Sequence, residues 1–298
     1  MKTKFKITGI LILFIFIIFG CEQNKYISKN SGNLIPIKSI THAHGIAVDA
    51  NNQSKLYIAT HHGLLTLVNG KNLYQIWESK NDYMGFSPHP TNAKVFFASG
   101  HPESGGNIGF WKSEDGGYSW RQISLGANGP VDFHAMGVSP VNPNIIYGYY
   151  QGDLQISTDG GKDWKIVYSK LPLVVSIAAD TKNEDIVYAA TIEGLMVSKD
   201  KGKTWDYASD DLKGFITLSS IAINPRDSKK MLSYSGKIGL AKSIDSGKTW
   251  QKTNSNFNEE SPLYLSFDNT DPDIVYAVTE KNSIFKSMDS GNSWKKFY

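Results

Sequence analysis

Short apolar runs separated by turn residues recur along most of the chain. Runs of five residues such as GIAVD, SIAAD, SIAIN and YLSFD are each followed, after a polar turn, by a second run rich in β-branched and aromatic residues, such as NIIYGYY or DIVYAVT. Runs this short, bounded by Gly, Pro, Asn and Asp, are typical of strands rather than helices. The pattern predicts an all-β protein built from antiparallel hairpins.

A turn motif divides residues 35–298 into units of nearly equal length. The motif S-x-D-x-G-x-[STD]-W occurs five times, and its first serines stand 44, 41, 45 and 44 residues apart. The earliest unit keeps the strand pattern but has Leu67–Gly70 in place of the motif. Six units of this length, each with strands A to D, predict a six-bladed β-propeller with four-stranded antiparallel blades. Residues Leu34–Ile40 offer a further strand, which would pair with the last blade and close the ring.

The five motifs resemble the Asp-box, or BNR repeat, of the propellers found in sialidases, sortilin-type receptors and a photosystem assembly factor. Their chemistry is local, because Ser and Asp side chains bond backbone amides of the C–D turn, Gly takes a conformation that other residues avoid, and Trp packs between blades. Five copies predict architecture rather than catalysis for the motif aspartates, which are Asp115, Asp159, Asp200, Asp245 and Asp289.

Residues 1–20 have the pattern of a signal peptide. Three lysines precede the apolar run Ile7–Phe19, which is too short to span about 30 Å of hydrocarbon and suits a signal-peptide core. The pattern resembles a bacterial lipoprotein signal, which implies that the single cysteine, Cys21, is lipidated and begins the mature chain. Residues 21–34 are polar and predict a flexible tether. We expect a lipid-anchored protein of the bacterial cell envelope, outside the cytoplasm; the alternative is an uncleaved anchor.

The charge balance argues against a nucleic-acid partner. The three lysines of the signal account for the formal charge of +3, which leaves 28 basic and 28 acidic residues in the rest of the chain. Proteins that bind nucleic acid need clustered cations facing the phosphates, and this composition offers no such excess.

The histidines gather on one face of the predicted propeller. The B–C turns and the connections from strand D to the next strand A share one face, here called the upper face, while A–B and C–D turns lie on the lower face. Blades one to three send six of the seven histidines to the upper face, and only His89 falls on the lower one. The six are His42, His44, His61, His62, His101 and His134.

A transition-metal site is the chemistry that this set favours. Neutral imidazole is a common metal ligand, and a thioether sulfur favours copper. Met84 and Met136 occupy the strand-A entry that His44 holds in blade one. The predicted metal ligands are His44, His101, His134, Met84 and His61, with copper as the first metal and zinc as the second if imidazoles alone bind. The alternatives are a small-molecule ligand, or side chains that only fill a narrow channel.

An enzymatic function is predicted less directly. A sialidase clamps its substrate with three arginines, and this chain has only Arg121 and Arg226. Another glycosidase needs two carboxylates across a cleft, for which Glu103 and Asp132 are the best pair on the upper face. Segments such as HAHGIAVD and DFHAMGVSP also resemble secreted bacterial propellers labelled glycosyl hydrolase. Three functions therefore stay open: metal binding, a non-sialidase glycosidase, and a scaffold for an envelope protein partner.

Overall fold

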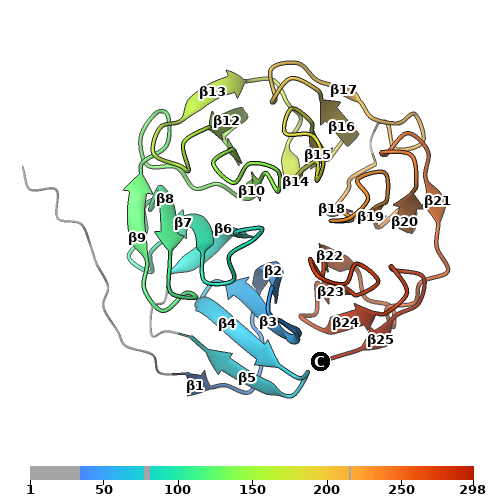
Figure 1. The fold of residues 1–298 in the computed structure, drawn as a ribbon, viewed down its shortest axis with the longest axis horizontal. Helices are drawn as coiled ribbons and strands as arrows, with labels where there is room; N and C mark the ends of the chain where they lie inside the picture. The colour runs from blue at the N-terminus through green and yellow to red at the C-terminus, as the bar shows by residue number, and fades with distance from the viewer. Residues whose placement is uncertain (1–33, 77–80, 215) are drawn as a thin grey trace, which may run out of the picture.

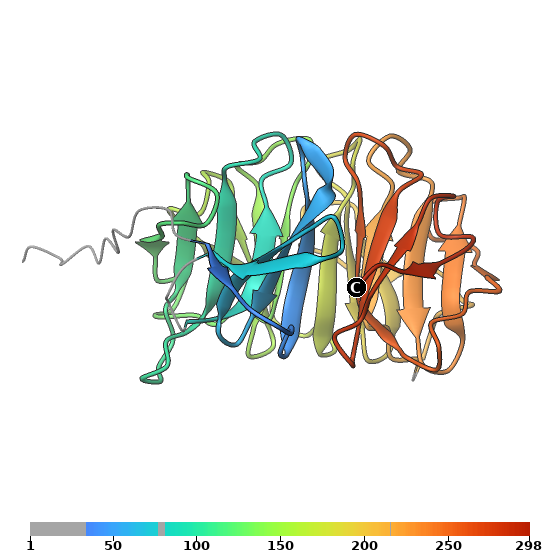
Figure 2. The same ribbon diagram turned by 90° about the horizontal axis from the view of Figure 1, so that it is seen from below.

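Six antiparallel sheets stand around a central axis as the blades of a propeller (Figure 1), with their inner strands running roughly along that axis (Figure 2). The computed structural model describes residues 34–76, 81–214 and 216–298. The predicted signal peptide, Cys21 and the tether up to residue 33 lie outside the described residues. Within them there is no helix, and so none long and apolar enough to cross a membrane. The predicted six-bladed β-propeller is confirmed.

The blades follow one another in sequence, each with its first strand innermost. Blade one holds β2 (Ala43–Asp49), β3 (Asn52–Thr60), β4 (Gly63–Val68) and β5 (Asn72–Gln75). Blade two holds β6 (Asp82–Pro88), β7 (Phe96–His101), β8 (Phe110–Ser113) and β9 (Arg121–Ser124). Blade three holds β10 (Ala135–Val138), β11 (Ile146–Tyr150), β12 (Asp153–Ser157) and β13 (Lys165–Tyr168).

The remaining three blades have very short outer strands. Blade four holds β14 (Val174–Ala179), β15 (Val187–Thr191), β16 (Gly194–Ser198) and β17 (Asp206–Tyr207). Blade five holds β18 (Ser220–Ile223), β19 (Met231–Ser235), β20 (Gly239–Ser243) and β21 (Gln251–Lys252). Blade six holds β22 (Pro262–Phe267), β23 (Val275–Thr279), β24 (Ile284–Ser287) and β25 (Lys295–Lys296).

The predicted pairing of the first strand with the last blade is wrong. Strand β1 (Ile35–Pro36) pairs antiparallel with β5, so it becomes a fifth, outermost strand of blade one. The last blade has no vacancy, because residues 262–296 supply all four of its strands. A proline suits this position, since an outermost strand leaves one row of backbone groups outside the ladder.

Side-chain packing between neighbouring blades holds the ring together. The described residues form six buried clusters, and each cluster draws its members from two adjacent blades. The motif tryptophans fill the seams: Trp120 lies between blades one and two, and Trp164 between blades two and three. The seam between blades six and one joins Tyr276 and Ile284 to Leu56 and Leu67, so the ring closes by apolar packing without a shared strand.

The motif turns on the lower face are held by their own side chains. In blade two, Asp115 accepts hydrogen bonds from the Ser113 hydroxyl at 2.9 Å, from the Ser119 amide at 2.9 Å and from the Ser119 hydroxyl at 2.6 Å. Hydrogen bonds of this kind hold the pKa of the Asp200 and Asp245 carboxyls down to about 2, with the hydroxyls of Thr204 and Thr249 as the largest cause. These aspartates therefore serve the turns.

Blade one replaces the motif with a tight turn. Asn69 and Gly70 both have positive φ, at 55° and 64°, as the two central residues of a type I′ turn do, and the Lys71 amide donates to the Val68 carbonyl at 3.2 Å. A Cβ on Gly70 would meet the carbonyl oxygen of Phe297 from the last blade. The small turn thus leaves room for the end of the chain, where the Tyr298 hydroxyl donates to the Lys38 carbonyl at 3.1 Å.

Candidate functional site

Four of the upper-face side chains meet where blades one and two adjoin. His44 belongs to β2, His61 follows β3 in the B–C turn of blade one, and Asp82 and His101 stand opposite each other at the ends of β6 and β7. We call these four residues the His/Asp cluster. The A and B strands of two adjacent blades and the B–C turn of blade one therefore build it.

Local backbone irregularities aim these side chains. The pairing of β2 with β3 shifts between Ala43 and Gly45, which leaves His44 as the bulged residue, and the same shift leaves Met84 bulged in β6. A β-bulge re-aims the side chain that it carries. His42, just before, has a φ of 52°, in the left-handed region that histidine enters more readily than most residues. Its ring stacks on that of His44, with centroids 5.2 Å apart.

The cluster centres on the Asp82 carboxylate. Nδ1 of His61 contacts Oδ2, Nε2 of His101 lies 3.5 Å from the same oxygen, and Nε2 of His44 lies 3.4 Å from Oδ1. One ligand atom each from His44, His61 and Asp82 all fall within 4.8 Å of one another. The side chain of Asp82 is only 5% exposed, whereas that of His101 is 40% exposed and forms the outer wall.

Two buried polar atoms of the cluster have no hydrogen bond with any described residue: Nε2 of His44 and Oδ1 of Asp82. They face each other at 3.4 Å, yet their geometry is not that of a hydrogen bond. Burying such atoms unpaired costs free energy, so a group that satisfies both would stabilise the site. Burial is also the main reason that the pKa of His44 falls to about 4; Asp82 opposes this fall, and the neighbouring imidazoles of His61 and His42 add to it. His44 is therefore neutral near pH 7.

The other predicted ligands lie nearby in different roles. His134 is bound to Asp132, with Nε2 2.9 Å from Oδ2, and this hydrogen bond raises the pKa of His134. Met84 lines the mouth of the central channel with His44 and His134. Met136 is buried lower in the same channel.

Three residues lie apart from the cluster. His62 is exposed beside His61, as expected for adjacent residues that cannot both face the channel. His89 lies in the lower A–B turn, where its Nδ1 accepts hydrogen bonds from the amides of Thr91 and Asn92 at 3.2 Å. Glu103 is exposed in the B–C loop of blade two, so of the proposed carboxylate pair only Asp132 is buried.

Asp82 is the residue that the sequence interpretation missed. It stands two residues before Met84, as His42 stands two before His44 and His134 two before Met136. An alignment of these strand entries would have placed Asp82 at the position that His42 and His134 occupy in blades one and three. Only the distances around its carboxylate show that the cluster centres on an acid.

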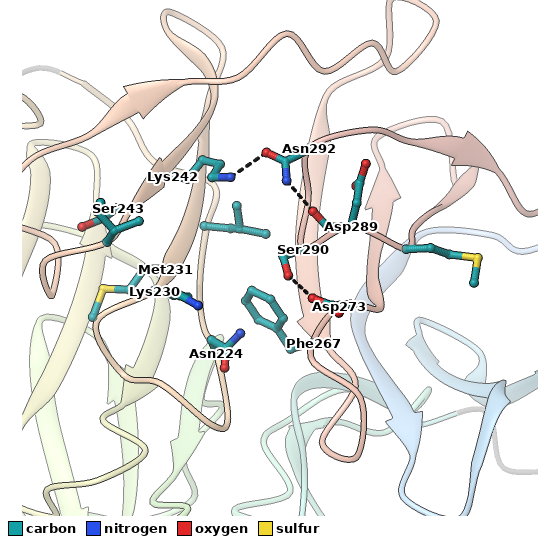
Figure 3. A pocket seen from close by; sticks show the side chains of 13 residues that line it. Asn224, Lys230, Met231, Lys242, Ser243, Phe267, Asp273, Asp289, Ser290 and Asn292 are labelled. Carbon is teal, nitrogen blue, oxygen red and sulfur yellow. Dashed lines mark hydrogen bonds between the residues drawn. The ribbon is translucent and has the colours of Figure 1, made fainter.

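A groove on the lower face offers a contrast to the cluster. It lies between blades five and six, has a volume of about 490 Å³ and is shown in Figure 3. Lys242 donates to Asn292 at 2.6 Å, and Ser290 donates to Asp273 at 2.6 Å. None of the described residues that line the groove has a buried polar side-chain atom without a hydrogen-bond partner, in contrast to the upper site.

Known proteins resemble this chain in fold. No protein-family model matches it, and no curated protein sequence does. Among solved structures, the GH74 enzyme of Niastella koreensis matches with a TM-score of 0.59 and 16% identity, over 85% of this chain and 46% of that one. The GH74 xyloglucanase of Xanthomonas campestris matches with a TM-score of 0.55 and 12% identity, over 89% and 56%. This chain thus spans about half the length of these enzymes.

A third structure matches nearly end to end. YCF48 from Cyanidioschyzon merolae has a TM-score of 0.53 and 14% identity, and the match covers 89% of this chain and 88% of that one. At such identities the likenesses show the fold alone, and they agree with the β-propeller fold that the sequence resemblance implied.

Proposed function

We propose that this propeller binds a divalent transition-metal ion at the His/Asp cluster, through His44, His61, His101 and Asp82. The observation that carries the proposal is the pair of buried, unpaired atoms, His44 Nε2 and Asp82 Oδ1, which a bound cation would satisfy together. Three imidazoles and one carboxylate form a donor set that metals of this class accept.

The spacing of the donors supports the proposal. Two ligands held at about 2.0–2.1 Å by a tetrahedral ion such as Zn²⁺ stand roughly 3.4 Å apart. The cluster holds His44 and His101 at 3.4 Å and 3.5 Å from the two Asp82 oxygens, whereas His61 Nδ1 contacts Oδ2 directly and must move apart from it to admit an ion. Because His44 stays neutral down to about pH 4, its lone pair is available to a metal without the loss of a proton. Copper(II) is the first choice, since it binds nitrogen and oxygen sites more tightly than other divalent ions of its row, and zinc is the second.

Elemental analysis and isothermal titration calorimetry test the proposal. The protein is expressed without a histidine tag, stripped with EDTA and titrated with Cu²⁺ and then with Zn²⁺. We expect one ion per chain. An Asp82→Asn variant should bind at least about 100-fold more weakly, because outer-sphere partners alone change metal affinity by 10–100-fold. A wild-type protein that binds neither ion stoichiometrically would contradict the proposal.

His89→Gln is the matched control for this experiment. It removes an imidazole of the same chemistry from the lower face, where His89 only supports a turn. Its metal affinity should equal that of the wild type. If it loses binding as well, the measured sites are adventitious surface histidines.

The proposed location of the protein is the cell envelope, anchored by a lipid on Cys21. The signal-like residues 1–20 and the lone cysteine that follows them support this, and the membrane is then the first partner. A Cys21→Ser variant should move from the membrane fraction to the soluble envelope fraction. Equal recovery of both forms in the membrane fraction would contradict lipid anchoring.

A glycosidase of non-sialidase type is the second candidate function. The fold likeness to GH74 enzymes favours it, and Glu103 with Asp132 is the carboxylate pair that it would use. Xyloglucan is the first substrate to assay, by release of reducing ends. Hydrolysis that survives EDTA and is lost in Glu103→Gln and Asp132→Asn variants would support the enzyme. Turnover unchanged in both variants would reject this pair.

A scaffold for an envelope protein is the third candidate. Its support is the match to YCF48 over nearly the full length of both chains. A partner that purifies with the wild type and is lost on upper-face substitution, without metal or turnover, would favour it.

A further inference from the structure

A cavity of about 710 Å³ lies at the mouth of the central channel, beside the His/Asp cluster. Its lining comes from five blades: His44 of blade one, Met84 of blade two, Tyr149 and Tyr150 of blade three, Leu173 before blade four, and Tyr264 of blade six. A volume of this size suits a small organic ligand. The hollow shares only His44 with the cluster, so it is a separate place for a ligand.

One wall of the cavity is apolar and fixed in position. The Tyr150 hydroxyl accepts hydrogen bonds from Asn107 Nδ2 at 2.8 Å and from Gln151 Nε2 at 3.0 Å, which hold its ring in place. Tyr149 is buried, and Leu173 leaves 56% of its surface exposed at the rim. An ordered aromatic wall beside an exposed leucine favours a ligand with an apolar body, because little side-chain freedom is lost on binding.

Just before β10, beside the strand that carries the two tyrosines, stands an acid with one unpaired oxygen. Asp132 is 7% exposed and lines the cavity. Its Oδ2 accepts from His134 at 2.9 Å, whereas its Oδ1 is buried without a hydrogen-bond partner among the described residues. The lining residues that the structure describes include two histidines, His44 and His134, and no lysine or arginine. A buried carboxylate oxygen without a donor calls for a donor from the ligand.

We propose that this cavity binds a primary amine with an apolar body, whose ammonium group donates to Oδ1 of Asp132 while the body packs on Tyr149, Tyr150 and Leu173. An ammonium supplies three donors and a charge opposite to that of Asp132, and aromatic rings attract cations. A carboxylate in the same position would face Asp132 with like charge. The proposal does not rest on the metal site.

Calorimetry with phenethylamine as the probe tests this assignment. The purified full-length protein is titrated with and without EDTA, so the result does not depend on metal binding. We expect saturable binding of phenethylamine and none of phenylacetate, which has a similar ring and the opposite charge. Asp132→Asn should weaken binding at least tenfold. Glu193→Gln, the same change of charge on the B–C turn of blade four, should leave it unchanged.

A second variant separates binding from folding. Leu173→Ser changes an exposed side chain, so the fold should persist, and it should weaken phenethylamine binding severalfold through the lost apolar contact. Thermal unfolding is measured for each variant. Absence of phenethylamine binding, equal binding of phenylacetate, or unchanged affinity in a folded Asp132→Asn variant would each overturn the proposal. If Asp132→Asn does not fold, the two probes and Leu173→Ser decide the question.

Discussion

The B–C turns of blades one and four make the same hydrogen bonds but present different side chains. In blade one, the Thr60 hydroxyl donates to the Gly63 carbonyl at 2.9 Å and accepts the His62 amide at 3.1 Å. In blade four, Thr191 makes the same two hydrogen bonds with Gly194 and Glu193, at 2.8 Å and 3.1 Å. The residue after each threonine is His61 in blade one and Ile192 in blade four.

The neighbouring blades differ in the same way. His61 faces Asp82 at the entry of blade two, whereas the Ile192 carbonyl accepts a hydrogen bond from Thr217 at the entry of blade five, at 3.5 Å. The hydrogen bonds of the turn therefore form whichever side chain follows the threonine. Two side chains from adjacent blades then decide whether a site forms there. One half of the upper face holds the His/Asp cluster, and the other presents the partly exposed Ile192 and Leu173.

Converting the first turn into the fourth should have the largest effect. His61→Ile places the blade-four side chain on the blade-one turn and removes one imidazole from Asp82. We expect the affinity for Cu²⁺ to fall at least about 100-fold, with little change in the thermal midpoint because the turn keeps its hydrogen bonds. The reverse change, Ile192→His, should create no second site, since Thr217 offers no carboxylate. A second bound ion in that variant would show that the turn alone suffices.

Acid should destabilise the metal-free protein through His44. Its pKa is about 4 in the folded state and about 6.5 when unfolded, so the unfolded state binds more protons between these values. Stability must then fall as the pH falls through this window. We expect a loss of about 1.6 kcal/mol in the free energy of unfolding between pH 6.5 and pH 5 from this group. Urea denaturation in EDTA measures it.

A His44→Gln variant serves as the control for the acid effect, because glutamine has no proton to gain. Its unfolding free energy should change less over the same pH range. An identical pH slope in the variant and the wild type would assign the effect to other groups.

Asp115 and Asp82 belong to the same blade and should respond in opposite ways. Asp115→Ala removes the acceptor of three hydrogen bonds in a lower turn, and we expect the free energy of unfolding to fall by about 1.5 kcal/mol. Its Cu²⁺ affinity should be unchanged. Loss of metal binding in this variant, once it is shown to be folded, would mean that the lower turns control the upper face.

The sequence predicts most of the fold because each repeat is defined by interactions between residues that are close in sequence. Turn residues such as Asp115 act on amides within four positions, and the tryptophans recur at fixed distances from them. The β1 pairing could not be read this way, since Ile35 finds Gln75 through a contact 40 residues away. Nothing local distinguishes an outer edge of blade one from that of blade six.

The sequence predicts only part of the candidate site, because the site also depends on contacts between residues of different blades. Histidines at strand entries show the face on which they gather, and this much follows from the repeat. Asp82 stands among them because of the way blade two packs against blade one and because of the bulges at His44 and Met84. Nor does the repeat pattern show that the imidazole of His134, a predicted ligand, lies within hydrogen-bond distance of Asp132, two residues earlier.

The smallest effect is expected for His62→Gln, which tests whether position or imidazole content decides metal binding. His62 and His61 are neighbours in one turn, and their ring centroids are 6.4 Å apart, but only His61 contacts Asp82. If position decides the chemistry, the Cu²⁺ affinity of His62→Gln should lie within about twofold of the wild type, because a surface side chain away from the ligands rarely changes a free energy by more than about 0.5 kcal/mol. Calorimetry on both variants under one buffer makes the comparison. Equal losses for the two neighbours would show that imidazole density on this rim, rather than the carboxylate of Asp82, holds the metal.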